Sequence, residues 1–184
     1  MASPARPALD RDRLVAAAFA HLDEDGLDGL SMRRLAARLG VQAPALYWHV
    51  GDKAELLGLM ARDIYAAAYE ALPSGPDWRM CLLAFGRALR AAFAAHRDGA
   101  RLCAMAPSPS DAGDHARRIA APLVALGFDQ QRALACEASV IAFVLGWASY
   151  EANGPMHAYL DEMLSFDASF DHGLTALVRG FEGP

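Results

Sequence analysis

Apolar side chains recur every three or four positions along most of the chain, the spacing that gathers them on one face of an α-helix. The first such series runs from Leu14 to Leu22, and Asp10 precedes it with a side chain suited to cap a helix N-terminus. Gly26 and Gly29 follow within a short turn-forming sequence. The pattern therefore predicts a helix that begins after Asp10 and stops before Gly26.

Short helices are expected next. Ser31 can cap a helix that Gly40 ends, because glycine tolerates the left-handed conformation common at helix C-termini. Another short helix is predicted over about 43–50. Asp52 and Glu55 then have the spacing of a capping box, so a longer helix should begin there.

The rest of the chain continues the helical pattern. Further helices are predicted at 54–72, 77–95, 98–105, 112–126, 130–152, 156–164 and 167–181. Residues 1–9, rich in Pro and Ala, are expected to be disordered, and residues 73–76 to form a linker. No run of alternating β-branched residues occurs, and Ala, the best helix former, supplies 40 of the 184 residues. The fold class is predicted to be all-α.

Charge is distributed unevenly. The chain carries a formal net charge of −5, which argues against a general affinity for nucleic acid. Between residues 31 and 53, however, Arg33, Arg34, Arg38 and Lys53 stand against a single acid, Asp52. This local excess of positive charge is typical of a docking surface for an anionic partner, although a solvated helix face has the same composition.

Cysteine use and hydropathy indicate where the protein works. The three cysteines are widely spaced and include no C-x-x-C pair, which argues against a disulfide framework or a zinc site and for a reducing compartment. The start of the chain lacks the apolar segment of a signal peptide. The most apolar stretch, the uncharged residues 138–150, is too short to span a bilayer. We expect a cytoplasmic protein that needs no metal or cofactor and does not bind membranes.

The segment 31–50 carries the most specific signal. Ala36 is small enough for two crossing helices to touch there, Gly40 permits the tight turn, and Leu46 and Val50 anchor the second helix. No acid occurs from residue 29 to 51, as expected of a surface that meets phosphates. This pattern predicts a DNA-binding helix-turn-helix, although such helix pairs also occur in proteins that never touch DNA.

Several segments resemble the TetR family of one-component repressors, especially its tetracycline-repressor branch. The resemblance is carried by Asp25-Gly-Leu-Asp-Gly-Leu-Ser31, Leu35-Ala-Ala-Arg-Leu-Gly-Val41, Pro44-Ala-Leu-Tyr-Trp-His-Val50 followed by Lys53, His96-Arg-Asp-Gly-Ala100 and, more weakly, Gly127-Phe128. It implies a DNA-binding domain over residues 10–53 and a helical ligand-binding and dimerisation domain over residues 54–184. It also implies a homodimer that represses from a palindromic DNA operator and is released by a small molecule.

Carried over position by position, the resemblance assigns DNA contacts to this sequence. Arg33 falls where the family reaches a guanine edge, which suits the bidentate geometry of a guanidinium. The expected DNA-contacting residues are Ser31, Arg33, Gln42, Ala43, Pro44, Ala45, Tyr47, Trp48, His49 and Lys53. Gln42 and Ala43 differ from the residues of the tetracycline repressor, so we expect a related but different operator.

The resemblance also implies an effector pocket between several helices of the second domain. The expected lining residues are Tyr65, Tyr69, Phe85, Leu89, Cys103, Met105, Ile119, Phe143, Trp147 and Tyr150. Aromatic and Met side chains suit an apolar or aromatic effector, for which we predict stacking on Phe143, Trp147 and Tyr150. Such residues at helical spacing are, however, more often ordinary core.

Magnesium-tetracycline is not the expected effector. The resemblance places Cys103 where the tetracycline repressor offers its magnesium-binding histidine, and a thiol is a poor ligand for that hard cation. It likewise places Tyr69 at the histidine that grips the tetracycline ring, and Ala142 and Tyr150 at two further polar anchors. Glu151 lies one residue beyond Tyr150 and is a possible substitute.

Dimerisation is expected through the helices at 130–152 and 167–181, which match the family's dimer-forming pair. Gly173 and Gly180 would permit close approach of the second of these helices. The aromatic stripe from Phe166 to Phe181 favours the same interface, although it is equally compatible with the core of a single chain.

Two other classes of function, an enzyme and a ligand-binding protein without a DNA function, are alternatives to a regulator. The sequence contains no G-x-S-x-G, H-E-x-x-H or phosphate-binding glycine loop, so no catalytic residues are assigned and we expect no enzyme. A helical ligand-binding protein without a DNA function is the main alternative to a regulator.

Overall fold

The computed structural model describes residues 9–72, 77–107 and 112–182. The helices in these ranges are α1 (Arg11–Gly29), α2 (Met32–Leu39), α3 (Ala43–Leu46), α4 (Lys53–Glu70), α5 (Trp78–Ala94), α6 (Gly99–Met105), α7 (Ala112–Val124), α8 (Gln130–Ala152), α9 (Gly154–Asp161) and α10 (Phe166–Gly180). No strand occurs within these ranges, in agreement with the all-α prediction. Residues 1–8 of the predicted disordered stretch 1–9, and the predicted linker 73–76, lie outside the described residues. Leu9 is described and packs half-buried against the core, so the disorder prediction is wrong for this residue.

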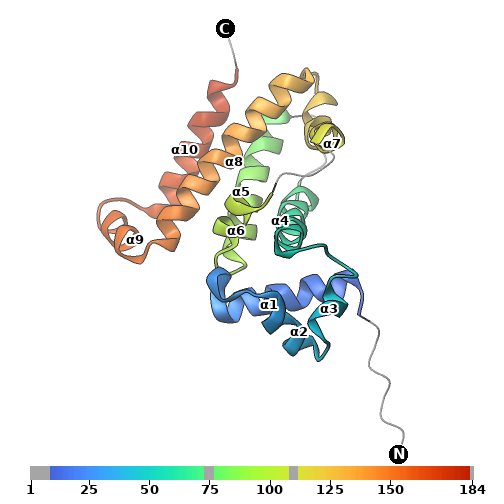
Figure 1. Cartoon of the computed structure of the whole chain (residues 1–184). Coiled ribbons are helices and arrows are strands. Elements are labelled where there is room, and N and C mark those ends of the chain that lie inside the picture. The colour runs from blue at the N-terminus through green and yellow to red at the C-terminus, as the bar shows by residue number, and fades with distance from the viewer. Residues whose placement is uncertain (1–8, 73–76, 108–111, 183–184) are drawn as a thin grey trace, which may run out of the picture.

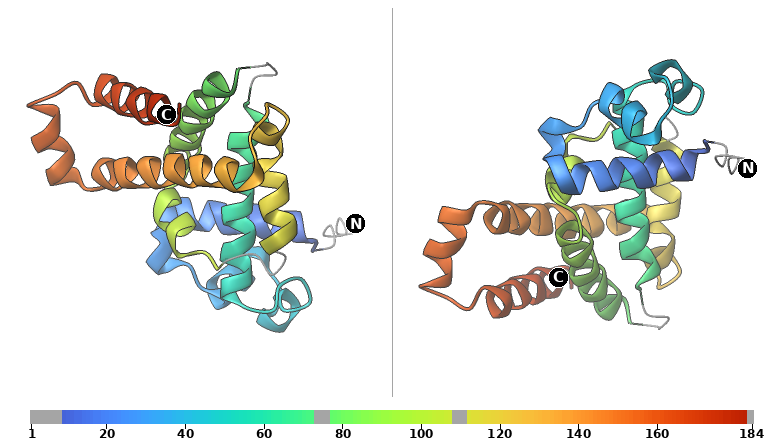
Figure 2. Two further views of the ribbon diagram at one scale, coloured as in Figure 1. Left: turned by 90° about the horizontal axis from the view of Figure 1, so that it is seen from above. Right: turned by 90° about the horizontal axis from the view of Figure 1, so that it is seen from below.

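The helices form a head and a body (Figure 1). The head comprises α1, α2 and α3, and α4 rises from it into the body, which comprises α4 to α10. The body is built around α8, which contacts α5, α6, α7, α9 and α10. Both views in Figure 2 place α9 at the far end of α8, away from α4 and α7.

Most helix boundaries follow their predicted caps. The Asp10 side chain accepts a hydrogen bond of 2.8 Å from the Arg13 backbone, and Asp52 accepts one of 2.8 Å from Glu55. α1 is continuous as far as Gly26, whose φ of +73° breaks the helical path where the sequence predicted a stop. Polar N-caps therefore fix where the helices begin, as expected from the orphan N–H groups they satisfy.

The aromatic stripe of α10 belongs to the core of the single chain. Phe166, Phe170 and Leu174 are buried without any partner subunit. Gly173 lies so close to the Phe143 ring that an added Cβ would come within 2.9 Å of it. The preference for a dimer role of this stripe is therefore wrong for these residues, because α5, α8 and α9 of the same chain pack against them.

α8 is also the one helix, among the described residues, with the length and composition to cross a membrane, having a mean hydropathy of 1.5 over its most apolar window. The sequence predicts no membrane span here, because the uncharged stretch 138–150 is too short to cross a bilayer. In the structure α8 is packed by helices on several sides, and central helices of soluble proteins pass the same test of length and composition.

Candidate functional site

The turn between α2 and α3 has the geometry that a helix-turn-helix requires. Gly40 adopts φ +67°, and the backbone N–H of Val41 donates to the carbonyl of Ala36 over 3.0 Å. This hydrogen bond closes the C-terminus of α2 and sets the direction of the chain into α3. Leu46 and Val50 are buried beneath the turn, as predicted.

α3 is shorter than the predicted helix over 43–50. Regular α-helix covers only Ala43–Leu46, and hydrogen-bonded turns continue to Val50. The backbone N–H of Tyr47 donates to Pro44 and that of His49 to Leu46, both spanning three residues. The chain therefore tightens at this point, as helices commonly do at their ends, while still burying Leu46 and Val50.

The predicted DNA-contacting residues divide into two groups by exposure. Arg33, Gln42, Pro44, Tyr47 and Trp48 are exposed, and we call these five residues the outer face of the head. Trp48 is 88% exposed, an unusual state for the largest apolar side chain. The remaining five are half-buried: Ser31, Ala43, Ala45, His49 and Lys53.

Part of the positive charge predicted for this region is neutralised. The Arg38 guanidinium forms a two-point ion pair with Glu24 of α1, and this partner holds the pKa of the Glu24 carboxyl below its usual value. Arg34 is exposed and donates a hydrogen bond of 3.4 Å to the carbonyl of Gly29. Arg33 is the exposed arginine of α2 for which the structure records no such partner among the described residues.

A polar junction ties the head to the body. The turn between α5 and α6 lies against the Asp23–Asp28 segment at the end of α1. Asp98 accepts a hydrogen bond of 2.8 Å from the Leu27 backbone, and Arg101 forms a two-point ion pair with Asp28 over 2.8 and 2.9 Å. His96 stacks on Phe19 with ring centroids 4.2 Å apart. Asp98 occupies the N-cap position of α6 but makes no capping hydrogen bond, because its carboxylate binds the head instead.

A row of polar groups crosses the interior of the body. It consists of Cys103 on α6, Tyr65 and Tyr69 on α4, and Glu137 on α8, and we call it the buried polar row. The Tyr69 hydroxyl donates to the Glu137 carboxylate over 2.8 Å. Tyr65 lies near enough to both Cys103 and Tyr69 for each pair to interact electrostatically.

Burial dominates the acid–base behaviour of this row. It raises the pKa of Glu137 to about 7, with the Tyr69 hydrogen bond acting in the opposite direction. It also raises the pKa of Cys103 to about 12, so this side chain is a neutral thiol at physiological pH. The pKa of Tyr69 is raised by burial first and by the neighbouring Glu137 charge second.

The predicted effector-lining residues do not form one contiguous surface. Tyr69 and Phe85 stack with centroids 4.7 Å apart, and Leu89 and Cys103 are buried. Phe143 and Trp147 instead pack on α10, each against Phe170. The remaining predicted residues lie at other depths: Tyr65 and Ile119 are half-buried, and Met105 and Tyr150 are exposed.

The helical period explains this division. Residues two positions apart on a helix point about 200° apart. The side of α8 that carries Phe143 is therefore opposite to the side that carries Leu145. The side of Phe143 and Trp147 meets α10, as the aromatic contacts show. Glu137, which the sequence analysis did not single out, lies in the interior with only 4% of its surface exposed. The sequence signal that could have identified Glu137 is that it is the one acid in the apolar series 133–148.

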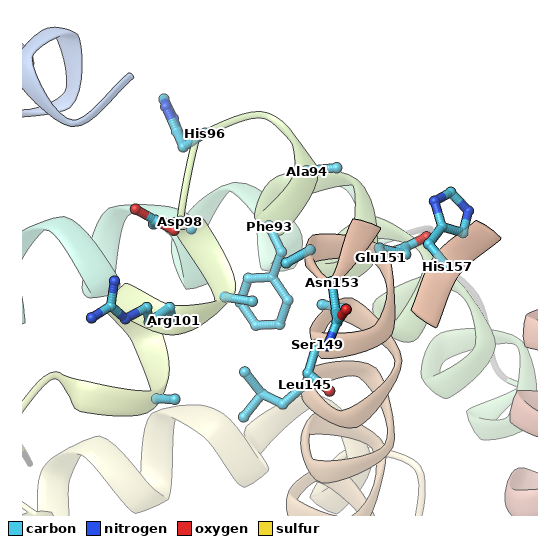
Figure 3. A pocket seen from close by; sticks show the side chains of 15 residues that line it. Phe93, Ala94, His96, Asp98, Arg101, Leu145, Ser149, Glu151, Asn153 and His157 are labelled. Carbon is cyan, nitrogen blue, oxygen red and sulfur yellow. The ribbon is translucent and has the colours of Figure 1, made fainter. Parts of the chain in front are cut away.

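An open cavity of about 900 Å³ lies beside the junction (Figure 3). Residues of α5, α6, α8 and α9 and of the α5–α6 turn line it, and none of the ten predicted effector residues is among them. Figure 3 places Phe93 and Leu145 near its centre, with His96 and Arg101 at its margin. Its wall therefore includes residues that also hold the head.

Comparison with known proteins identifies the family. Residues 14–60 match the model "Bacterial regulatory proteins, tetR family", and residues 72–163 match "Tetracyclin repressor-like, C-terminal domain". The chain belongs to the TetR family. It is 32% identical to the class D tetracycline repressor protein of Escherichia coli, over 95% of this chain and 89% of the relative. It is thus a member of a family of DNA-binding transcriptional regulators.

Two further relatives extend the comparison. An HTH-type transcriptional regulator of Saccharopolyspora erythraea is 36% identical over 82% of this chain, and the aligned region spans 64% of that regulator. A glutamine-to-alanine variant of TetR from Acinetobacter baumannii AYE, solved in complex with minocycline, is 35% identical. The match covers 95% of this chain and 97% of that one, with a TM-score of 0.79. These relatives are regulators rather than enzymes.

Proposed function

We propose that this TetR-family protein is a ligand-released repressor that binds a palindromic DNA operator as a homodimer. The observation that carries the proposal is the outer face of the head, where Trp48 is 88% exposed on a surface without acids. An exposed aromatic and the exposed guanidinium of Arg33 both suit a groove lined by phosphates and base edges. Residues 10–53 would form the DNA-binding unit and residues 54–184 the unit for ligand binding and dimerisation.

Each group of the head would have a distinct role. Arg33 would read a guanine edge, and Gln42, Ala43, Pro44, Ala45, Tyr47 and His49 would contact bases and phosphates. Ser31, Trp48 and Lys53 would contact the backbone. Lys53 is half-buried at the start of α4, where the chain leaves the head, and its ammonium supplies the positive charge that a phosphate contact needs.

The dimer would form through α8 and α10, on the sides that the single chain leaves open. Gly146 of α8 and Gly180 of α10 have no neighbouring atom within 4 Å of an added Cβ, unlike Gly173. The arm formed by α9 exposes Tyr159 and, just beyond it, Met163. Two-fold symmetry would place the heads about one helical turn of DNA apart.

Ligand release requires that the effector bind the DNA-free state more tightly than the DNA-bound state. The junction supports such coupling, because Asp98 of the α5–α6 turn and Arg101 of α6 hold the head. α4 supplies a second connection, since it begins at the head and carries Tyr65 and Tyr69 into the body. We propose the buried polar row and the aromatic rings around it as the effector site, with an aromatic effector that needs no metal.

A mobility-shift assay on the DNA upstream of the protein's own gene tests the regulatory role. Wild type should give a specific shift, and Trp48→Ala should weaken it at least tenfold. Met80→Ala is the matched control, because Met80 is an exposed apolar residue of α5 in the body and its loss should leave the shift unchanged. A protein that binds ligands but shifts no DNA would support a ligand carrier instead.

A further inference from the structure

Glu137 is a buried acid that has no positive partner among the residues the structure describes. Only 4% of its surface is exposed, and among the described residues the one group recorded to hydrogen-bond its carboxylate is the Tyr69 hydroxyl. Removing a carboxylate from water is costly unless a cation or several donors compensate it. A single phenol supplies one donor and no charge. The ionised form of Glu137 is therefore undercompensated in the free protein.

One arginine of α8 and one of α5 bind other partners. Arg132, which precedes Glu137 on α8, lies over the Phe128 ring and donates to the carbonyl of Phe181 over 2.7 Å. Arg90 of α5 pairs with Glu151 and with Asp167. Both arginines thus bind groups other than the Glu137 carboxylate.

The Tyr69 ring, whose hydroxyl contacts this acid, belongs to a set of aromatic side chains on α4 and α5. Tyr69 of α4 stacks on Phe85 of α5 at 4.7 Å and 23°, and Tyr65 meets Phe93 edge-on at 6.2 Å. Both tyrosines are partly exposed, whereas Glu137 is nearly sealed. A guest that approaches across the tyrosines would therefore meet aromatic faces first and the carboxylate last. Aromatic faces attract cations through their negative quadrupole.

We propose that Glu137 is the anionic anchor for a cationic aromatic effector, which pairs with the carboxylate and lies against the Tyr69 and Phe85 rings. The proposal deepens the proposed function and rests on the effector site assigned there. Binding would replace the Tyr69 hydroxyl as the main partner of Glu137. Because Tyr69 is on α4, which connects the head to the body, the exchange would act on the helix that positions the outer face.

Three planar probes of similar shape and different charge test this assignment on the full chain without DNA. They are N-methylacridinium, which is permanently cationic, acridine at pH 8, which is neutral, and anthracene-9-carboxylate, which is anionic. Calorimetry would measure each affinity for wild type, Glu137→Gln and the control Glu70→Gln. Glu70 is the exposed acid next to Tyr69 on α4, so the control removes the same charge outside the site.

Wild type and Glu70→Gln should bind N-methylacridinium at least tenfold more tightly than acridine, and anthracene-9-carboxylate most weakly. Glu137→Gln should lose this preference while binding acridine as well as wild type does, which also shows that the variant is folded. Equal binding of all three probes by wild type, no binding of the cation, or a preference that survives in Glu137→Gln would overturn the assignment. Because no DNA is present, these results are independent of the mobility shift that tests the regulatory role.

Discussion

The Asp98 carboxylate of the α5–α6 turn accepts a hydrogen bond of 2.8 Å from the backbone N–H of Leu27 in the head. The two residues are 71 positions apart in sequence, and both lie where the backbone leaves regular helix. Asp98 has φ +58°, and Gly26, next to Leu27, has φ +73°. An added Cβ on Gly26 would come within 3.0 Å of the Asp98 carboxylate. Head and body are thus fitted together through two unusual backbone conformations.

Replacing Asp98 should weaken this connection. Asp98→Ala removes the acceptor for the Leu27 N–H and places Ala in a left-handed conformation, so we expect a loss of about 1–3 kcal/mol in the free energy of unfolding. Asp98→Asn keeps a side-chain oxygen and tolerates the same backbone, so it should lose less than about 1 kcal/mol. Urea denaturation measures both, and equal losses would show that the hydrogen bond contributes little.

DNA affinity should separate two basic residues of the head. Arg33→Ala is expected to cost roughly 1–3 kcal/mol on the specific operator and to relax the preference at one base pair, because the exposed guanidinium would read a guanine edge. Lys53→Ala should weaken all sequences alike, as the loss of a phosphate contact does. Competition binding with operator and random DNA distinguishes them. A uniform loss for Arg33→Ala would mean that Arg33 contacts only the backbone.

Glu137 should make stability depend on pH. Burial raises its folded-state pKa to about 7 from 4.5, so the folded chain binds this proton more tightly than the unfolded chain. The contribution of this bound proton to the free energy of unfolding is therefore fully present below about pH 4.5 and is lost as pH rises through 7. Glu137→Gln, which cannot ionise, should lie within about 1 kcal/mol of wild type near pH 5 and exceed it by up to roughly 3 kcal/mol at pH 8.

Denaturation of both proteins at pH 5 and pH 8 isolates this effect, since every other titrating group is shared. Glu70→Gln serves again as the control, because an exposed acid should show no such difference. A gap between wild type and Glu137→Gln that stays constant with pH would mean that the buried carboxyl does not titrate in this range.

The fold could be predicted closely because its signals are local. Asp10 and Asp52 cap the helices they were expected to cap, and Gly40 ends α2 in the left-handed conformation. The extent of α3 was overestimated, because apolar spacing at Leu46 and Val50 is equally compatible with regular helix and with the tighter turns observed. Periodicity reports which side of the chain is buried, not its exact hydrogen-bond pattern.

The site was harder to predict because it depends on contacts between distant segments. Glu137 and Tyr69 are 68 residues apart, and the sequence around neither residue indicates the hydrogen bond between them. The sequence assigns Arg38 to a cationic surface, whereas in the structure Arg38 is paired with Glu24. The aromatic residues Phe143 and Trp147 have the composition of a ligand site, yet their rings face α10. Which face of a helix meets which neighbour is a property of the assembled body.

The structure bears directly on the response to tetracycline with magnesium. Cys103, which the family resemblance aligns with the magnesium-binding histidine, is 9% exposed, and burial raises its pKa to about 12. The side chain is therefore a neutral thiol, which is a soft and weak donor for a hard cation that prefers oxygen. Glu151, the possible substitute ligand, is already paired with Arg90.

We therefore expect tetracycline with magnesium to bind poorly and to leave the protein on its DNA, although relatives are tetracycline repressors. Calorimetry with tetracycline, first with magnesium and then with EDTA, measures the metal-dependent part of binding. Cys103→His, which restores an imidazole at this position, should increase that part, whereas Cys81→His changes a buried thiol on α5 outside the row and should not. Tight, magnesium-dependent binding by wild type, accompanied by release of DNA, would show that other groups in the body hold the chelate. In that case Glu151 is the residue to test first, because separation from Arg90 would free its carboxylate oxygens for the metal.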